Sequence, residues 1–597
     1  MKTTHIIYTM ILAGAAMMTA CDESDFLDNK PQGVMSEDIL NSAEGVDQLV
    51  TAAYAALTGP NPQDWSVWWT PTTNWTFGEV RGDNAYKGGG GTGDGNDAHR
   101  MEVFTVDATN GQVDGKWYHL YTSVQRCNSA LKVLANCSES DVPAKAVRIA
   151  EMKALRAHYY FELSRLFNQI VWIDETMDEQ AYATEANNKY SRNEILELIA
   201  KDFADAAEVL PDAQGEIGRV NKWMAKAYLA KVHLYRAYEQ DAQHKVVNIN
   251  KDELQKVVSL CEELKGTGKY GLLDDFQQLD LVEYENGRES VWAVQYSMND
   301  GSASAGRINW SNLLNAPQGP YSGDGFFLPS QDLINAYQTD ANGLPLLDGS
   351  WQNADYDVIT FEGEQPINNQ VDATVDPRLD FVVGRPNVRW KTYTETPCLA
   401  TWVRDRGTYG YHCCKRFFVS PESPKMYPGW PWGASELNWQ IIRYADILLW
   451  ESEALVELGR QDEARPLVNE IRRRAKQSAW VTAFEGEHCP NFNGYAANYK
   501  IEEYPATGWT QDYARKAVRF ETRLEKAMEG ERFFDLVRWG IAAETMNKYI
   551  ECEKDNRVYY GEAQFVEGRD EYFPLTDNQF KFSGNTYVQN PGYASFQ

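Results

Sequence analysis

The chain has 597 residues, of which 43% are hydrophobic and 24% charged, a composition typical of a folded globular protein and not of a disordered one. Its formal net charge of −29 disfavours nucleic acids and polyanionic glycans as partners, so neutral ligands fit better. The nine cysteines show no CxxC or paired Cys/His zinc spacing, and we predict no metal site, no cofactor and no particular disulfide.

The N-terminus predicts a secreted protein with a lipid anchor. Residues 6–20 form an apolar run behind Lys2 that is too short for a permanent transmembrane helix, so residues 1–20 are interpreted as a signal peptide. The run ends in Met-Thr-Ala before Cys21, where cleavage would leave Cys21 available for acylation. Two or three acyl chains anchor a protein stably. An ordinary secretory signal with an incidental cysteine is the alternative.

Apolar residues recur at helical spacing on both sides of a long irregular middle. In the first block this pattern predicts helices over residues 42–57, 113–134, 144–167, 191–210, 221–238 and 251–264. Successive helices are expected to stack in pairs of about 34 residues, as tetratricopeptide units do, although the full consensus is absent. A later pair, over residues 442–458 and 462–476, is expected to close the array.

Residues 64–84 combine aromatic and polar side chains without a helical period. Sugars present C–H faces that pack on flat aromatic rings, while their hydroxyls need polar partners, so a glycan platform needs both residue types together. The candidate ligand-binding residues of this segment are Trp65, Trp68, Trp69, Asn74, Trp75, Arg81, Asp83 and Asn84. The alternative is that about half of these tryptophans are buried in the core, as is usual for this residue.

The middle of the chain predicts a second ligand-binding region. Residues 290–296 have strand character, and the segment that follows is rich in Gly, Ser, Asn and Pro, which indicates loops. Trp310 and Tyr321 are the candidates there, and Trp430 is among several further tryptophans of lower priority. We expect one domain over residues 21–597, with helical scaffold at about 40–280 and 438–550 and a loop-rich part at about 290–435. A division into two domains near residue 280 is the alternative.

Two further motifs receive structural interpretations. The glycine run at residues 88–95 lacks the lysine of a phosphate-binding loop and the terminal glutamate of an EF-hand, so a flexible loop is preferred. Near the C-terminus, Arg532, Phe533, Phe534 and Trp539 are expected to pack in the core from an amphipathic helix. The charged residues just before them are expected to lie on a helix surface, namely Glu521, Arg523, Glu525, Glu529 and Glu531.

Several stretches, spread over nearly the whole chain, carry a resemblance to a known family. They are Phe26-Leu27-Asp28 with Pro31, ALRAHYYFEL (154–163) followed by RLF (165–167), DPRL (376–379), RYADILL (443–449) with EAL (453–455), and EGERFFDLVRWG (529–540). Each is weak alone. Together, in this order and beside a lipoprotein signal, they resemble the SusD/RagB family.

The resemblance implies a mainly α fold with four tetratricopeptide-like repeats and a loop-rich, partly β ligand-binding face. It implies binding of a neutral oligosaccharide or polysaccharide and a lid role over a SusC-like TonB-dependent outer-membrane transporter. The acidic residues Asp22, Glu23 and Asp25 are similar to the surface-export signal of Bacteroidetes lipoproteins, which implies anchoring on the outer face of the outer membrane.

Two other functions compete with this interpretation. A peptide-binding component of a RagA/RagB-like importer would use the same scaffold, although the tryptophan-rich loops favour sugar. A glycoside hydrolase needs only two carboxylates about 5–10 Å apart, which an acidic sequence cannot exclude. No HExxH, GxSxG or local catalytic triad occurs, so we predict no enzyme and assign no catalytic residue.

Overall fold

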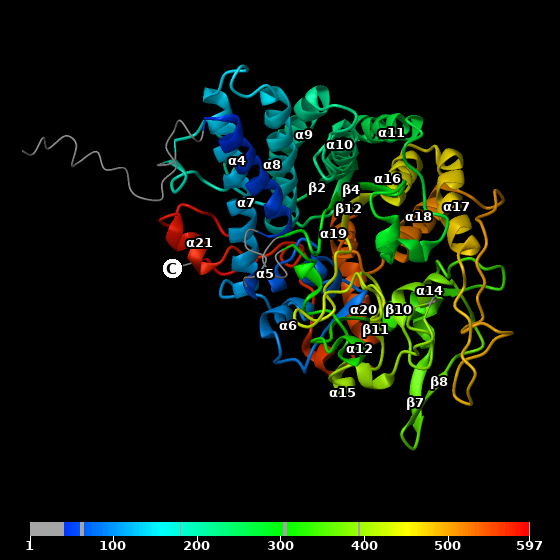
Figure 1. Cartoon of the computed structure of the whole chain (residues 1–597). Helices are drawn as coiled ribbons and strands as arrows, with labels where there is room; N and C mark the ends of the chain where they lie inside the picture. Colours follow the sequence, from blue (N-terminus) through cyan, green and yellow to red (C-terminus); the bar gives the residue numbers. More distant parts are fainter. Residues whose placement is uncertain (1–40, 60–64, 179–180, 302–306, 392–393, 596–597) are drawn as a thin grey trace, which may run out of the picture.

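The structure is a computed structural model that describes residues 41–59, 65–178, 181–301, 307–391 and 394–595. Long helices lie side by side along one side of the molecule, and short helices, short strands and loops occupy the other (Figure 1). The predicted anchor residue Cys21 and the Phe26-Leu27-Asp28 motif lie outside the described residues. Within the described ranges no helix is long and apolar enough to span a membrane.

The long helices agree with the predicted ones to within two residues at each end. They are α4 (Ala43–Ala55), α7 (Gly111–Asn136), α8 (Lys145–Phe167), α9 (Arg192–Val209), α10 (Lys222–Ala237), α11 (Lys251–Gly266), α16 (Tyr444–Glu457) and α17 (Gln461–Gln477). Polar N-caps fix several starts: Asn110, Asn221 and Asn250 accept hydrogen bonds from the first free N–H groups of α7, α10 and α11.

Consecutive helices pack on one another from α7 to α11. The next helix of the stack is α16, which packs on α11 and also on α17 and α18 (Gln511–Glu525). The segment between α11 and α16 is therefore an insertion between two neighbours in space, which explains why the helices form two blocks in the sequence. The predicted tetratricopeptide-like scaffold is confirmed, but the pair α16–α17 does not close it, because α18 continues the stack.

The remaining elements are short and are concentrated on the opposite side. The short helices are α5 (Trp65–Trp69), the π-helix η2 (Trp75–Val80), α6 (Asn96–Glu102), α12 (Gln318–Tyr321), α13 (Gln331–Ala336), α14 (Arg378–Val382), α15 (Arg406–Tyr409), α19 (Arg532–Arg538), α20 (Ala542–Glu553) and α21 (Asp577–Phe582), with 3₁₀ turns such as η6 (Trp310–Asn312). Residues 64–84 are thus partly helical, contrary to expectation, because a five-residue helix and a π-helix are too short to show a 3.6-residue period.

The strands form antiparallel pairs only, within the described residues. The pairs are β1 (Ala85–Gly88) with β5 (Phe326–Pro329), β2 (Tyr238–Gln240) with β3 (Val246–Ile249), β4 (Ser290–Val294) with β12 (Trp439–Arg443), β6 (Gln338–Thr339) with β9 (Thr374–Val375), β7 (Val358–Glu362) with β8 (Gln365–Asn369), and β10 (Val383–Gly384) with β11 (Cys413–Cys414). The predicted strand at 290–296 is confirmed as β4. Its partner β12 runs directly into α16, so this sheet joins the two ends of the insertion.

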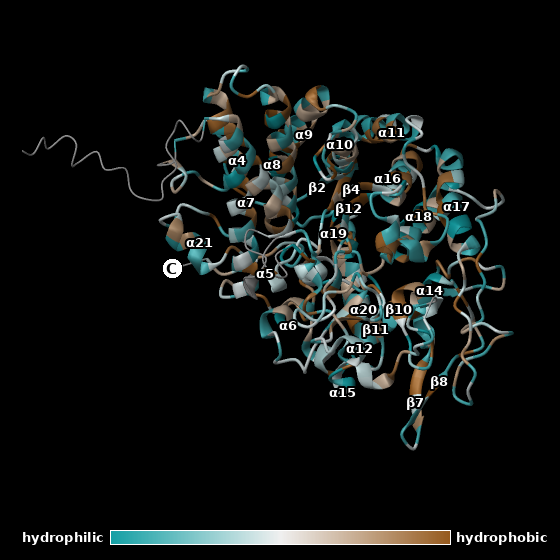
Figure 2. Cartoon of the chain, viewed as in Figure 1, coloured by the Kyte–Doolittle hydropathy of each residue, from teal (hydrophilic) through white to brown (hydrophobic). Residues whose placement is uncertain are grey.

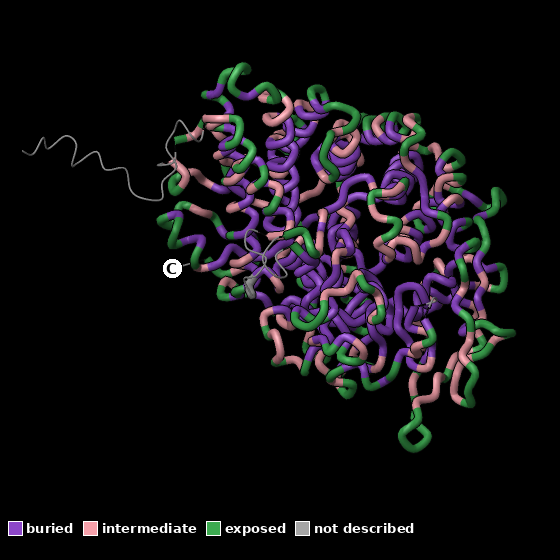
Figure 3. The backbone as a smooth tube through the Cα atoms, viewed as in Figure 1, coloured by how far each residue is buried: buried purple, intermediate pink, exposed green. Residues whose placement is uncertain are grey.

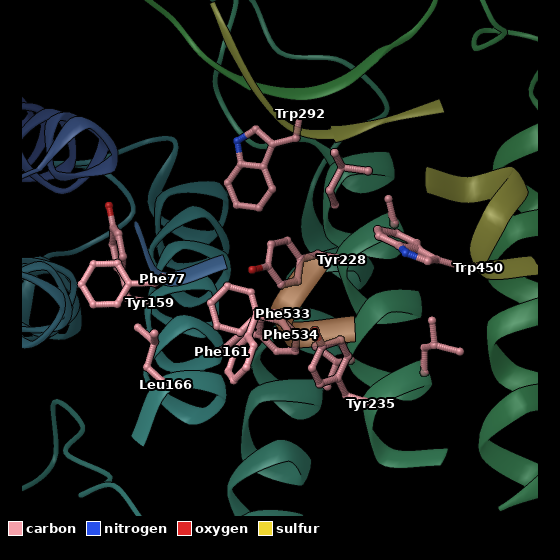
Figure 4. Close-up of a cluster of buried hydrophobic side chains, with 14 of the residues drawn as sticks. Phe77, Tyr159, Phe161, Leu166, Tyr228, Tyr235, Trp292, Trp450, Phe533 and Phe534 are labelled. Carbon is pink, nitrogen blue, oxygen red and sulfur yellow. The ribbon is translucent and has the colours of Figure 1, made fainter. Parts of the chain in front are cut away.

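Residues from both helical blocks share one hydrophobic core. Phe161 of α8 lies 5.3 Å from the ring of Tyr228 of α10, and Trp292 of β4 lies 5.6 Å from the same tyrosine, while Phe533 and Phe534 of α19 approach from the C-terminal block (Figure 4). Hydrophobic residues concentrate on the inner sides of the helices (Figure 2). The hairpin β7–β8 projects from the body with an exposed tip (Figure 3).

Four of the five charges that precede α19 are buried and the fifth, Glu531, is half-buried, so the predicted surface position of the four is wrong. Glu521, Arg523, Glu525 and Glu529 are at most 6% exposed. Arginines from distant segments pair with these carboxylates: Arg443 donates to Glu525 and Glu529, and Arg378 donates to Glu525. Buried charges are tolerated when they are paired and hydrogen-bonded. The local pattern of α18 could not reveal partners that come from residues 376–474.

Candidate functional site

Two of the predicted residues, Trp68 and Trp310, come together with a third ring, Trp430. Trp68 of α5 and Trp310 of η6 stack with ring centroids 6.2 Å apart and planes inclined by 9°. Trp430 stands edge-on to both, with centroid distances of 5.9 Å to Trp68 and 5.3 Å to Trp310. We call these three residues the tryptophan cluster.

The three rings differ in how far solvent can reach them. Trp430 is 53% exposed, Trp68 is partly buried and Trp310 is 3% exposed. A small apolar core of Ile308, Leu313 and Ala434 supports Trp310. The cluster is therefore an anchored group of rings from which one indole projects into solvent, and its outermost ring is available for stacking.

The loop that carries Trp430 is held by local hydrogen bonds. The Tyr427 N–H donates to the Ala434 carbonyl over 2.8 Å and closes the turn around Trp430. Tyr427 also packs, partly buried, against the same small core. The neighbouring ring of Trp432 is 38% exposed and is not part of the cluster. These contacts fix Trp430 in place without burying its ring.

Charged side chains lie on the segments that carry Trp310 and Trp430. Met298 packs on the small core, and its N–H donates to Glu436 over 3.2 Å, while Lys425 donates to the same carboxylate over 2.5 Å. In the adjoining loop Arg307 lies 3.5 Å from Asp300. Carboxylate, ammonium and guanidinium groups near an exposed indole can hydrogen-bond to the hydroxyls of a stacked sugar.

The loop that follows β11 also borders a hollow of about 590 Å³. Its lining includes hydroxyls of Thr394, Ser420 and Ser423 and the carboxylates of Glu283 and Glu422. The Met426 N–H donates to the Ser423 carbonyl, so the lining of the hollow continues along the chain into the loop of Trp430. Hydroxyl and carboxylate groups thus extend along this face beyond the rings.

Trp69, Asn74 and Trp75 do not reach this site. Trp69 and Trp75 pack on Phe326 with centroid distances of 4.9 and 6.2 Å, and they are 8% and 1% exposed. The amide of Asn74 donates to Glu162 over 2.7 Å in the interior. The structure gives these three side chains interior positions. Trp65 begins α5, and its side chain lies outside the described residues.

Arg81, Asp83 and Asn84 are also buried, and each has a partner in the C-terminal part of the chain. Arg81 donates to the Asp570 carbonyl over 2.6 Å, Asp83 accepts two hydrogen bonds from Arg532, and Asn84 accepts one from Arg523 over 2.9 Å. Burial alone would raise the pKa of Asp83, but the two guanidinium groups lower it to about 2. These side chains therefore join distant segments.

Tyr321 has a structural position too. Its hydroxyl donates to the Val419 carbonyl over 2.7 Å and accepts from the Trp390 indole N–H over 2.8 Å, and the residue is 3% exposed.

Trp430 has a lower priority in the sequence analysis than the buried residues above. The signal that could have found it is its setting, Pro-Gly-Trp-Pro-Trp-Gly, because turn residues on both sides of a tryptophan indicate a loop tip.

The glycine run at residues 88–95 closes around the side chain of Lys87. The Lys87 ammonium donates to the carbonyls of Gly88 and Gly91, each over 2.9 Å, and to that of Asp94. The loop thus closes around a lysine of its own chain with carbonyl groups, whereas a phosphate loop offers N–H groups. No group of three or more histidine, cysteine or acidic side chains suited to a metal occurs in the described ranges.

Several known proteins that are similar to this chain belong to one group, the SusD-like proteins. A family model described as the SusD family matches residues 288–593, and one described as starch-binding associating with outer membrane matches residues 25–234. SusD-like protein P2 of Formosa agariphila is 25% identical over 99% of each protein. A SusD superfamily structure from Bacteroides vulgatus has a TM-score of 0.66 at 19% identity and covers 92% of this chain and 99% of its own.

One of the similar solved structures is a complex with an oligosaccharide. Surface glycan-binding protein A from Bacteroides thetaiotaomicron in complex with laminarihexaose has a TM-score of 0.61 at 18% identity, covering 92% of this chain and 99% of its own. At this identity the likeness concerns the fold. The helical stack and the loop-rich opposite side are therefore features that this chain shares with a protein solved with an oligosaccharide.

Proposed function

Because the chain belongs to the SusD family, we propose that it binds glycans without cleaving them and that Trp430 is the ring on which a sugar stacks. The observation that carries the proposal is the exposed Trp430 indole held against Trp68 and Trp310. A fixed aromatic plane suits the C–H face of a pyranose, and because Trp430 is already held in place, little side-chain freedom is lost on binding. The protein's net negative charge favours a neutral oligosaccharide or polysaccharide.

The proposed binding surface includes fewer residues than the sequence predicted. Trp75, Arg81, Asp83 and Asn84 are buried and bonded within the protein or packed in its core, so we leave them out of the binding surface. Polar contacts are assigned instead to side chains beside the rings, such as Lys425 and Glu436. Affinity should be moderate, since hydrogen bonds to exposed hydroxyls replace bonds to water.

We further propose that the protein is anchored by lipid at Cys21 on the cell exterior and delivers its ligand to a SusC-like TonB-dependent transporter. The support for the anchor is the signal sequence that ends before Cys21. The support for the location is the match of residues 25–234 to a family of starch-binding proteins associating with the outer membrane. The partner follows from the family alone. Co-purification of a transporter from membranes, lost when Cys21 is replaced by serine, would test both parts.

The glycan proposal is tested with the soluble mature chain and a panel of neutral polysaccharides that includes laminarin and starch. We expect retardation in affinity electrophoresis and at least about fivefold weaker binding after Trp430→Ala, since loss of a stacked ring costs about 1–3 kcal/mol. Trp432→Ala is the matched control, because this exposed neighbour lies outside the cluster. Equal loss in both variants, or no retardation by any glycan, would refute the platform.

A parallel assay of reducing ends separates binding from hydrolysis. If sugar is released by the wild-type chain, the protein is a glycosidase and the non-catalytic proposal is wrong. Binding without release, sensitive to Trp430→Ala and not to Trp432→Ala, is the expected result.

A further inference from the structure

A second hollow, of about 530 Å³, lies beside α18 and is built from elements other than those of the tryptophan cluster. Its apolar walls are Leu347, Phe520 and Ile541, with Trp539 among the lining side chains. Three basic residues of α18, Arg515, Lys516 and Arg519, line it as well. We call this hollow the basic groove.

Arg515 is hydrogen-bonded to two neighbouring carboxylates. It donates two hydrogen bonds to Glu457, over 2.7 and 2.9 Å, and one to Asp512 over 2.8 Å. Its charge is therefore balanced within the protein. Arg532 also lines the groove, and its charge is balanced by Asp83. The capacity of the groove to hold an anion therefore rests on Lys516 and Arg519.

Arg519 has donor capacity that its surroundings do not use. Its Nη2 lies 3.7 Å from Glu457, beyond hydrogen-bond distance, and its Nε is buried without a hydrogen-bond partner in the described part of the chain. The guanidinium carbon lies 5.0 Å from the centroid of the Trp539 ring, which orients it by a cation–π contact. A charged guanidinium whose donors are not all used can bind an acceptor that enters the hollow.

Lys516 adds a second available cation. It is exposed and makes no ion pair or hydrogen bond with any described residue. Two cations without full partners in one apolar-walled hollow contrast with the net charge of −29 of the whole chain. Because the rest of the surface repels anions, an anion that binds here must gain its affinity locally.

We propose that the basic groove binds a sugar residue that carries a carboxylate or sulfate group. The anion would accept hydrogen bonds from Arg519 and Lys516, and the C–H face of the sugar would pack on Phe520. This inference rests on the proposed glycan binding but uses a different site and a different ligand chemistry. The protein would then recognise an acidic substituent in one place and a neutral sugar face in another.

The experiment is calorimetric titration of the mature chain with trigalacturonate and, separately, with dextran sulfate, using uncharged dextran as the reference. The two anionic probes distinguish carboxylate from sulfate. We expect at least tenfold tighter binding of one anionic probe than of dextran at low salt, falling as salt is added, because charge-assisted hydrogen bonds are screened.

Arg519→Gln and Lys516→Gln should each weaken anion binding at least about threefold, and the double variant at least about tenfold. Lys476→Gln, which removes a surface lysine paired with Glu502, is the control and should change nothing. Lys516 is exposed, so its variant keeps the test valid if Arg519→Gln folds poorly. Unchanged affinity in the Lys516 variant, or no anion binding by the wild-type chain, overturns the proposal. Failure of this proposal would leave the proposed glycan platform untouched, because that platform is tested separately by the loss of neutral-glycan binding on Trp430→Ala.

Discussion

Asp83 and Arg532 are 449 residues apart in the sequence and are joined by two hydrogen bonds of 2.7 and 2.9 Å. Asp83 is 2% exposed and also lies 3.4 Å from Arg523. The pair fixes the segment between η2 and β1 onto α19. It thereby ties a loop near the start of the chain to a helix of the C-terminal part, and it accounts for the buried position of residues that the sequence placed on a binding surface.

Replacing Asp83 by asparagine should reduce the free energy of unfolding by about 3–5 kcal/mol, since Arg532 loses the carboxylate with which it pairs and Arg523 keeps only Asp332. Urea unfolding followed by tryptophan fluorescence measures the loss. Glu503→Gln removes one partner of the exposed pair Arg473–Glu503 and should cost less than about 1 kcal/mol. Equal costs for the two substitutions would contradict the structural role given to Asp83.

Two glycines, Gly78 of η2 and Gly530 before α19, allow the same two segments to approach closely. Gly530 has φ +80°, and a Cβ on it would lie 2.0 Å from the Thr73 carbonyl oxygen, while a Cβ on Gly78 would lie 1.8 Å from the Gly530 oxygen. Gly530→Ala should therefore lower the thermal midpoint strongly or prevent folding, because backbone atoms cannot move aside.

Gly494→Ala is the matched control for that substitution. Gly494 has φ +94°, but its added Cβ would meet no atom within 4 Å, so only the strain of the left-handed backbone remains. We expect a cost of about 1–2 kcal/mol there. Soluble yield and the thermal midpoint of both variants give the comparison, and similar values would show that the contact with Thr73 does not matter.

The helices were predictable because their information is local. Apolar spacing and polar caps such as Asn221 and Asn250 belong to single segments, and both ends were found to within two residues. The expected place of the later helix pair in the array is confirmed, because α16 packs on α11. The pattern did not predict that α18 continues the stack, because α18 is separated from α17 by more than thirty residues.

The candidate site was predictable only in part. Trp68 and Trp310 were singled out and meet in the structure, but sequence cannot distinguish a buried tryptophan from an exposed one, as Trp75 shows. Arg81 looked like a ligand-binding residue because its partner, the Asp570 carbonyl, lies 489 positions away. Polar residues paired over such distances carry no local sign of their burial.

Acid should unfold the protein through the buried carboxylates. Burial alone would raise the pKa of Glu525, but Arg474, Arg443 and Arg378 lower it from 4.5 to about 2. A carboxylate with a lowered pKa contributes stability that is complete above pH 4.5 and is lost as the pH falls through about 2. The urea midpoint should therefore fall steeply between pH 4.5 and 2.

Glu525→Gln tests the assignment of that acid transition. The variant should be less stable at pH 7, because three arginines lose a counter-ion, and its stability should change less between pH 4.5 and 2 than that of the wild type. Glu263→Gln, at an exposed carboxylate paired with Lys226, should leave the curve unchanged. A pH dependence in Glu525→Gln as steep as in the wild type would assign the acid transition to other groups.

In the tryptophan cluster, we expect the outer ring to contribute to glycan binding and the inner ring to contribute mainly to the stability of the fold. Trp430 is 53% exposed, so Trp430→Ala should change the free energy of unfolding by less than about 1 kcal/mol while it abolishes glycan retardation. Trp310 is 3% exposed, so Trp310→Ala should cost about 3–5 kcal/mol by leaving a cavity under Trp430. It should also weaken binding, since Trp430 loses the ring that holds it. If Trp430→Ala instead destabilised the protein as much as Trp310→Ala, the outer ring would be part of the core, and the sugar platform would have to be sought elsewhere.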